Sequence, residues 1–323
     1  MSWIEISLNT NHEAVDWVCT LLAKEISQED FHIVEYASDP DQNREPWAFT
    51  ILMYLPNDLQ IHQRVETIAN ILKPLHRTGM TSEMQTFVVD SKPILETGAS
   101  QVRHISDRFA IVTDHLGYAP RHDQEIVLYL QNSLAFGSGL HPATILSLRL
   151  LERHVQPELQ TLDLGSGSGL LSVAIAKLGA RVLAIDNDPV AVAATEDAVQ
   201  RNQVTDLVKV QLASLGSASQ LGHWMGGESA EQVPAIAAEG QFDLIVANIF
   251  ARVHISLAAE FAEALRANSG ILITAGYTRD RAEDVVTAMR AVGLYESDRL
   301  QLDEWVAIAF CNNSSNILHS QNR

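Results

Sequence analysis

Near the middle of the chain stands the sequence Leu162-Asp163-Leu164-Gly165-Ser166-Gly167-Ser168-Gly169-Leu170. Apolar residues lead into its three alternate glycines, and apolar residues at helical spacing follow them over residues 171–175. Glycine allows a tight turn and a close approach of the backbone to a ligand. The N–H groups at a helix N-terminus favour an anionic or polar group nearby. We therefore expect a strand, a ligand-binding turn and a helix in succession.

A second apolar segment, residues 182–185, ends in Asp186. An acid at the end of a second strand, about 20 residues after such glycines, is placed to accept hydrogen bonds from a ribose. Nicotinamide-binding proteins use G-x-G-x-x-G, but Leu170 occupies the place of their third glycine. The pattern is G-x-G-x-G instead, which is typical of methyltransferases that use S-adenosylmethionine. That cofactor has a methionine group in place of pyrophosphate, and Asp163 would suit its α-amino group.

Strand and helix patterns alternate through the C-terminal half of the chain. This alternation predicts an α/β fold with a Rossmann-like, doubly wound and mostly parallel sheet. Residues 213–241 interrupt it with a long segment rich in Gly, Ser and Ala, which we expect to be a surface excursion. The expected strands are residues 161–164, 182–186, 207–212, 242–248, 271–275 and 305–311, and the expected helices are residues 189–201, 252–267 and 280–291.

The first part of the chain predicts a smaller α+β domain without a catalytic motif. Strand and helix patterns alternate there at residues 3–8, 12–24, 49–55 and 61–72. The pattern then weakens, with short strands expected at residues 109–112 and 126–130. We expect an N-terminal α+β domain over residues 1–86, a connector over 87–125 and the cofactor-binding domain over 126–323.

Composition narrows the range of partners. The 323 residues carry a formal net charge of −18, from 40 acidic and 22 basic residues, and the acidity is spread over both halves. Such a surface repels nucleic-acid phosphates and attracts a basic protein, although it could also serve solubility alone. We see no apolar run long enough for a membrane and no secretory signal. Cys19 and Cys311 lack the spacing of metal ligands, which favours reduced thiols in the cytoplasm and no metal site.

Two further motifs flank the glycine-rich turn in sequence. One is Ala135-Phe136-Gly137-Ser138-Gly139-Leu140-His141-Pro142-Ala143-Thr144, which precedes an expected helix. The other is the strand at residues 242–247, which ends in Asn248. Ligands of open α/β sheets bind beyond the carboxyl ends of the strands, so we expect Asn248 to point toward the same ligand as Gly165 and Asp186. Alternatively, Asn248 could cap a helix and His141 could be an ordinary loop residue.

Together these motifs resemble the bacterial methyltransferases that modify ribosomal protein L11. That family carries A-F-G-T-G-T-H-P-T-T, D-x-G-x-G-S-G-I-L, I-D-x-D-P and A-N-I, and this chain has similar segments in the same order. The resemblance implies a class I methyltransferase fold, S-adenosylmethionine as cofactor and an N-terminal domain that recognises the protein substrate. It places Thr144, Gly165, Asp186 and Asn248 at the cofactor, and we add Phe136, Asp163, Gly167 and Gly169 to the same site.

The chain departs from the family pattern in the first of these motifs. Ser138, Leu140 and Ala143 replace threonines, which leaves Thr144 as the only threonine there. The segment before the motif also lacks the D-P-G that the family usually has. The resemblance is looser before residue 134, which affects the identity of the substrate more than the chemistry.

The expected reaction is methyl transfer to a lysine or α-amino group of a large-subunit ribosomal protein. We assign catalytic roles to Asn248, which would orient the amine together with the loop of Ser138 and Thr144, and to His141, which would relay its proton. Methyltransferases of exocyclic base amines have prolines and an aromatic residue at the position that Ile249-Phe250-Ala251 occupies here, which disfavours a nucleic-acid substrate. Another protein lysine, a small molecule, or cofactor binding without catalysis remain alternatives. The sequence does not indicate an oligomeric state.

Overall fold

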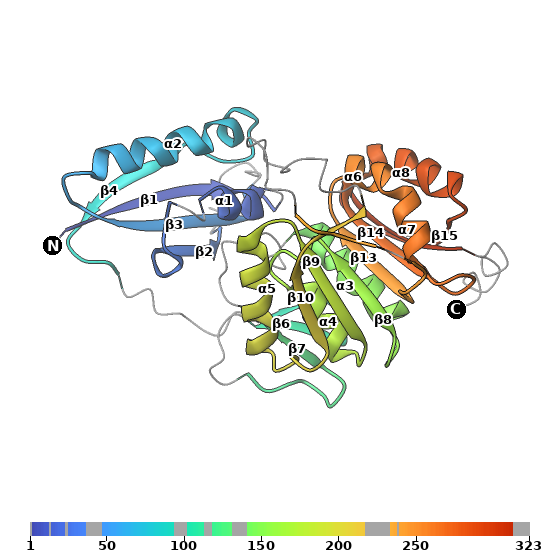
Figure 1. Ribbon diagram of the computed structural model, residues 1–323. Helices are drawn as coiled ribbons and strands as arrows, with labels where there is room; N and C mark the ends of the chain where they lie inside the picture. Colours follow the sequence, from blue (N-terminus) through green and yellow to red (C-terminus); the bar gives the residue numbers. More distant parts are fainter. Residues whose placement is uncertain are drawn as a thin grey trace.

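The computed structural model describes residues 2–12, 14–22, 25–36, 47–93, 102–112, 118–130, 141–216, 233–237 and 239–312. Figure 1 shows a smaller N-terminal part, coloured blue to cyan, beside a larger part coloured green to red. The two parts touch where the ring of Trp17 stacks on that of Phe250. Each part contains its own sheet, and the larger sheet positions the candidate site.

The larger part contains a seven-stranded sheet with the order β10-β9-β8-β13-β14-β16-β15. Neighbouring strands from β10 to β14 run parallel, whereas β16 runs antiparallel to both β14 and β15. The expected doubly wound, mostly parallel sheet is therefore confirmed. The strands are β8 (Gln160–Leu164), β9 (Arg181–Asp186), β10 (Val208–Leu212), β13 (Leu244–Asn248), β14 (Ile271–Thr278), β15 (Tyr295–Leu302) and β16 (Trp305–Cys311).

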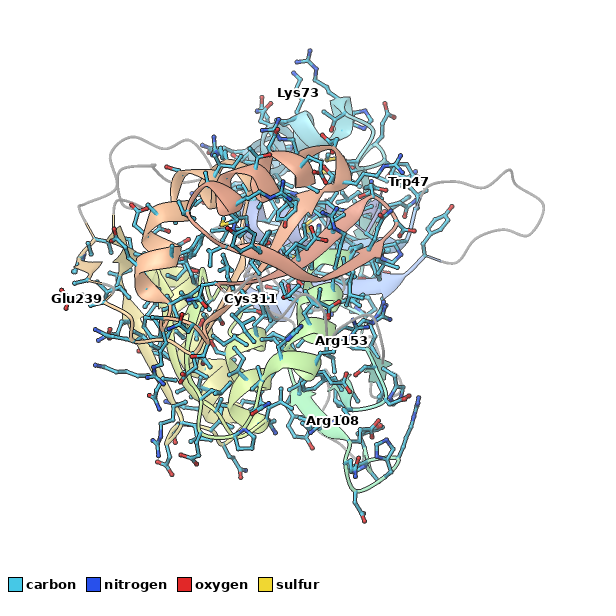
Figure 2. The ribbon with its side chains drawn as sticks, turned by 90° about the vertical axis from the view of Figure 1, so that its right-hand side faces the viewer. Trp47, Lys73, Arg108, Arg153, Glu239 and Cys311 are labelled. Atoms are coloured by element: carbon cyan, nitrogen blue, oxygen red, sulfur yellow. The ribbon has the colours of Figure 1, made fainter. Side chains whose placement is uncertain are left out.

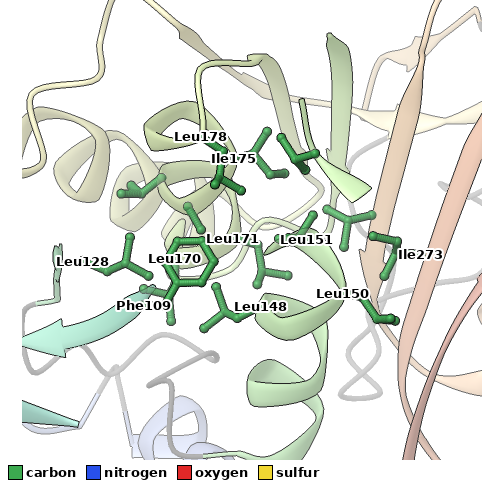
Figure 3. Close-up of a cluster of buried hydrophobic side chains, with 14 of the residues drawn as sticks. Phe109, Leu128, Leu148, Leu150, Leu151, Leu170, Leu171, Ile175, Leu178 and Ile273 are labelled. Carbon is green, nitrogen blue, oxygen red and sulfur yellow. The ribbon is translucent and has the colours of Figure 1, made fainter. Parts of the chain in front are cut away.

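Helices cover both faces of this sheet, which explains why its central strands read as continuous apolar runs. On one face α3, α4 and α5 enclose a buried cluster that includes Leu148, Leu171 and Ile273 (Figure 3). On the other face α6, α7 and α8 enclose a second cluster, which includes Phe261 and Val285. The helices are α3 (Pro142–His154), α4 (Leu170–Lys177), α5 (Pro189–Arg201), α6 (Ala251–Ser256), α7 (Ala258–Ala264) and α8 (Arg279–Ala291).

Two features of the larger part differ from the sequence-based expectation. The helix expected over residues 252–267 is two helices, because Leu257 leaves helical geometry (φ −96°, ψ 12°) while its side chain stays fully buried. The strand β15 was not expected, because it is a polar edge strand with little periodic burial. Arg153, labelled in Figure 2, helps to fix β15 with its Nη1 3.1 Å from both carboxylate oxygens of Asp298.

The N-terminal part contains a four-stranded antiparallel sheet with the order β2-β3-β1-β4. Side chains alternate along β1, so that Ile6 and Leu8 join a core with buried residues of the two helices, α1 (Ala14–Leu22) and α2 (Ile61–Arg77). This part therefore has the expected α+β composition. Its strands are β1 (Trp3–Thr10), β2 (Phe31–Glu35), β3 (Phe49–Pro56) and β4 (Gln85–Val89), with a short 3-10 helix at Gln28–Asp30.

A third, three-stranded sheet lies between these parts in sequence, with β5 (Val102–His104), β6 (Phe109–Val112) and β7 (Ile126–Tyr129). It is tied to the larger part by Asn202, whose side chain accepts from the backbone N–H of Tyr129 (2.8 Å) and donates to its carbonyl (2.7 Å). The expected boundary after residue 86 falls inside β4, and the one after residue 125 falls between paired strands. The division into residues 1–86, 87–125 and 126–323 stays a prediction.

No helix in the described ranges is long and apolar enough to cross a membrane. Within the same ranges no group of three or more His, Cys, Asp or Glu side chains is placed to hold a metal ion. Cys19 and Cys311 are both buried.

Candidate functional site

The strand order of the larger sheet reverses at its centre. Strands β9 and β10 follow on one side of β8, whereas β13 and β14 lie on its other side. Ligands of open α/β sheets bind outside the carboxyl ends of the strands at such a point. Gly165 follows β8, Asp186 ends β9 and Asn248 ends β13, so three separate sequence motifs meet at one edge.

The glycine loop between β8 and α4 has a backbone that only glycine adopts easily. Gly165, Gly167 and Gly169 all have positive φ angles, of 76°, 53° and 77°. A Cβ on Gly165 would lie 2.8 Å from the Cγ2 of Ile249, and one on Gly169 would lie 2.8 Å from the backbone of Thr195. The loop therefore packs tightly against both the residue after β13 and α5. Its backbone, rather than any side chain, is available to bind a ligand.

Asp186 is fixed by backbone N–H groups on both sides. Its Oδ2 accepts a hydrogen bond from Gly167 (3.0 Å), and its Oδ1 accepts one from Asp188 (3.0 Å). Burial raises the pKa of the carboxyl, and these amide hydrogen bonds act against that rise. Asp186 thus stands beside the glycine loop, at the position that the sequence predicted for a ribose ligand.

Asp163 lies beneath the glycine loop and is fully buried. Its Oδ2 accepts a hydrogen bond from the Ser172 hydroxyl (2.5 Å), which ties β8 to the first turns of α4. Its Oδ1 has no hydrogen-bond partner in the described part of the chain. Burial raises the pKa of this carboxyl to about 7, with the Ser172 hydrogen bond acting against the rise and the charge of Asp186 contributing to it. The contact of Asp163 with an amino group stays a prediction.

Asn248 and Thr144 come together, although 104 positions separate them in sequence. The amide Nδ2 of Asn248 donates to the hydroxyl Oγ1 of Thr144 at 3.3 Å. The Oδ1 atom of Asn248 is buried and accepts no hydrogen bond from any described residue. A buried oxygen that lacks a donor is costly unless a ligand or water supplies one. The pair therefore presents a hydrogen-bond acceptor at the edge where the glycine loop lies.

His141 precedes α3 and acts as its N-cap. Its Nδ1 accepts a hydrogen bond from the Ala143 N–H (3.1 Å), and its ring meets the edge of Trp305 with centroids 4.2 Å apart. Burial, together with a smaller contribution from His12, lowers the pKa of His141 to about 4, so the ring is neutral at neutral pH. This geometry gives His141 a capping role at the start of the helix that carries Thr144. Its role as a proton relay stays a prediction.

Phe136 and Ser138, which the sequence assigned to the same site, fall at residues 131–140, outside the described residues.

Two apolar residues near Asp186 were missed by the sequence reasoning. Leu212 ends β10 directly opposite Asp186 in the strand register and is 42% exposed, and Val190 in the first turn of α5 is 44% exposed. Exposed aliphatic side chains on either side of a polar anchor suit a flat, apolar group. Val190 stands two residues after Asp188, and Leu212 ends the third strand. Their positions in the sequence, rather than their residue type, are the feature that could have identified them.

The N-terminal part borders the edge that carries Asn248. Trp17 of α1 stacks on Phe250, two residues after Asn248, with ring centroids 5.6 Å apart and an angle of 24°. His12 lies just before α1 and is close enough to lower the pKa of His141. The smaller sheet is therefore held next to the Asn248 side of the site.

Comparisons with known proteins agree with this geometry. A family model described as ribosomal protein L11 methyltransferase (PrmA) matches residues 2–313. A relative of that name from Chloroflexus aurantiacus is 39% identical over 325 residues, covering 95% of this chain and 97% of the relative. One from Herpetosiphon aurantiacus is 35% identical over 318 residues, covering 95% and 98%. The crystal structure of a ribosomal protein L11 methylase from Lactobacillus delbrueckii subsp. bulgaricus has 27% identity and a TM-score of 0.55, covering 65% of this chain and 97% of that one.

Proposed function

Because the chain belongs to the ribosomal protein L11 methyltransferase family, and is thus a methyltransferase, we propose that it transfers methyl groups from S-adenosylmethionine to amino groups of ribosomal protein L11. The observation that carries this proposal is the meeting of the glycine loop, Asp186 and Asn248 at one strand edge. The matched family covers both the cofactor motifs and the N-terminal part of the chain.

The residues at the edge fit S-adenosylmethionine. The backbone of the loop from Gly165 to Gly169 would hold the methionine group, because no side chain at the glycines covers the backbone N–H groups. Asp186 would accept hydrogen bonds from the ribose hydroxyls, and Val190 and Leu212 would flank the adenine. When bound, this cofactor supplies an electrophilic methyl group on a sulfonium.

Asn248 would orient the amine that receives the methyl group. Methyl transfer is an in-line displacement, so rate depends mainly on the alignment of the nitrogen lone pair. The unpartnered Oδ1 of Asn248 can accept one N–H of a neutral amine, and Thr144 fixes the Asn248 amide through its hydroxyl. An amine with fewer water contacts has a lowered pKa and is more often neutral. His141, neutral at neutral pH, would relay the proton that the amine loses, and to accept it the Nδ1 atom would have to release the Ala143 N–H.

The N-terminal part, residues 1–86, would recognise the protein substrate, with residues 87–125 as the connector and residues 126–323 as the catalytic domain. Contact between Trp17 and Phe250 supports this role, because it holds the smaller sheet beside the amine-binding residues. The net charge of −18 favours a basic ribosomal protein and opposes direct binding of nucleic acid. A ribosomal substrate also implies action in the cytoplasm.

The proposal is tested by two measurements on the purified protein. Calorimetric titration with S-adenosylmethionine, with NADH as the control ligand, tests the cofactor. Labelled-methyl transfer onto a mixture of large-subunit ribosomal proteins then tests the acceptor. We expect binding of S-adenosylmethionine alone and label in ribosomal protein L11. Binding with label in another protein would contradict the acceptor, and a lack of binding would contradict the cofactor.

A further inference from the structure

His254 of α6 is a fully buried histidine beside the end of β13, and none of the roles described above uses it. Its Nε2 lies 2.9 Å from the carbonyl oxygen of Ala275. The same oxygen accepts a hydrogen bond from the backbone N–H of Ile249, the residue after Asn248, at 3.1 Å. One carbonyl of β14 is therefore shared between the strand end that carries Asn248 and the His254 ring.

The protonation state of His254 follows from these contacts. A carbonyl oxygen can only accept, so the Nε2 atom carries the proton and donates to Ala275. Burial lowers the pKa of the ring to about 4, more than the carbonyl groups of Ala275 and Ile249 raise it. His254 is thus a neutral imidazole at neutral pH, with its Nδ1 as a bare acceptor.

That acceptor has no hydrogen-bond partner among the residues that the structure describes. His254 sits against an apolar cluster, with the rings of Tyr277 and Phe261 at centroid distances of 5.5 Å and 6.1 Å. A leucine could fill such a place without leaving a polar atom unsatisfied. Packing alone therefore does not account for an imidazole here, whereas a need for the Nε2 donor does.

The carbonyl that His254 holds belongs to the residue opposite Asn248. Asn248 and Ala275 are partners in the β13–β14 register. The next residue, Gly276, has a φ of +89°, and a Cβ there would lie 2.6 Å from the Ile249 carbonyl and 2.9 Å from the Oδ1 of Asn248. The backbone of Gly276 thus packs closely against the Asn248 side chain, and a shift of the adjoining Ala275 peptide would reach Asn248 through Gly276.

We propose that His254 is a positioning residue for methyl transfer, which acts through Ala275 and Gly276 on the Asn248 side chain. This rests on the proposed role of Asn248 in orienting the amine. The Nε2–H of His254 fixes the Ala275 carbonyl, the carbonyl fixes the Ile249 amide, and the Asn248 Oδ1 is held in the direction that the acceptor amine requires.

Two substitutions separate positioning from simple packing. His254→Gln keeps an N–H donor near the Nε2 position, whereas His254→Leu removes it with little loss of apolar volume. We expect His254→Leu to lower kcat by about 10-fold, because a small misplacement near the reacting groups is costly, with KM for S-adenosylmethionine within about 2-fold of wild type. His254→Gln should recover most of the lost kcat.

A double variant tests whether the effect passes through Asn248. In an Asn248→Ala background, His254→Leu should cause no further loss of kcat, because the positioned group is already gone. Val285→Ala serves as the control, since Val285 of α8 is buried in the apolar cluster that includes Phe261 and Tyr277, to which Ala275 does not belong. It should lower the melting temperature and leave kcat unchanged at a temperature where the protein is folded.

Amide hydrogen exchange gives a readout that does not require activity. Exchange at Ile249 should be about 10-fold faster in His254→Leu than in wild type, because one restraint on its acceptor is lost, and close to wild type in His254→Gln. Unchanged exchange and kcat in His254→Leu, equal losses in the Gln and Leu variants, or additive losses with Asn248→Ala would each overturn the proposal. If wild type fails to methylate ribosomal protein L11, the proposed function fails, and the exchange measurement still decides the role of His254.

Discussion

The glycine loop, Asp186 and Asn248 meet at the carboxyl ends of the central strands. The two sides of this edge differ in the groups that form their surface. On the glycine-loop side, which comprises residues 165–169 with Asp163 and Asp186, backbone shape and backbone N–H groups form the surface. On the Asn248 side, which comprises Thr144, Asn248 and His254, side-chain atoms carry the polar contacts. From this difference we expect cofactor affinity and turnover to depend on different residues. Substitutions on one side should therefore change one quantity much more than the other.

Asn248→Ala should have the largest effect. Removal of the Oδ1 acceptor should lower kcat by about 100-fold, as the loss of one oriented hydrogen-bonding group in an active site typically does. The dissociation constant for S-adenosylmethionine should change by only a few-fold. Single-turnover methyl transfer and calorimetric titration measure the two quantities separately. Equal losses of kcat and of affinity for S-adenosylmethionine would contradict the distinction between the two sides.

Gly165→Ala should have the reverse effect and change the affinity for S-adenosylmethionine much more than kcat. Alanine at a φ of 76° is strained, and its Cβ would lie 2.8 Å from the Cγ2 of Ile249, so the loop or Ile249 must shift and the loop backbone loses its binding geometry. We expect the affinity for S-adenosylmethionine to fall by roughly 30-fold, about 2 kcal/mol. Gly293→Ala is the matched control, because Gly293 has a φ of 82° and no described atom lies within 4 Å of its Cβ position. An equal loss of affinity in the control would assign the effect to general strain.

A fall in pH should change the contributions of His254 and Asp163 to the stability of the protein in opposite directions. The pKa of His254 in the folded state is about 4, below its ordinary value of 6.5, so its stabilising contribution is complete above pH 6.5 and is lost as pH falls toward 4. The pKa of Asp163 is about 7, above its ordinary value of 3.8, so its protonated form gains stability as pH falls from 7 toward 4. The two contributions oppose each other in the wild type, and variants are needed to separate them.

Urea unfolding at pH 7 and pH 5 provides that separation. Relative to wild type, His254→Gln should gain about 1–2 kcal/mol of stability on going from pH 7 to pH 5. Asp163→Asn should lose a similar amount relative to wild type over the same interval, because only the wild type takes up the proton. Parallel pH curves for the wild type and both variants would contradict these assignments.

Leu212→Ser should have the smallest effect. The side chain is already 42% exposed, so its removal should leave the free energy of unfolding nearly unchanged. The affinity for S-adenosylmethionine should fall by about 5-fold, because one apolar contact with the adenine is lost. Leu59→Ser, at a fully exposed leucine of the N-terminal part, is the control and should leave the affinity unchanged. Unchanged affinity in Leu212→Ser would remove this residue from the cofactor site.

Most of the glycine-loop side could be predicted from the sequence because its signals are local. The three glycines, Asp163 and Asp186 lie within two successive strand–turn units, and the structure places them where the spacing indicates. Asn248 and Thr144 were also predicted, because a strand end and a helix start are visible as local patterns. Their hydrogen bond across 104 positions was not, since it depends on the tertiary arrangement of the sheet.

The sequence could not show the features that depend on tertiary contacts. His254 lies in the six-residue helix α6, and only the parallel register of β13 and β14 reveals that its ring meets the carbonyl opposite Asn248. Leu212 and Val190 look like ordinary apolar residues until their exposure is known. The break at Leu257 carries no glycine or proline, and β15 is recognisable only from its pairing with β16.

The central claim is that the chain methylates ribosomal protein L11 with a methyl group from S-adenosylmethionine held by the glycine loop. Intact-mass spectrometry of purified ribosomal protein L11, after incubation with S-adenosylmethionine and the enzyme, tests it most directly. We predict methyl groups on lysine or α-amino nitrogen with wild type, and a greatly reduced amount with Gly165→Ala at the same cofactor concentration. Unmodified ribosomal protein L11 after incubation with a wild-type enzyme that binds S-adenosylmethionine would contradict the account.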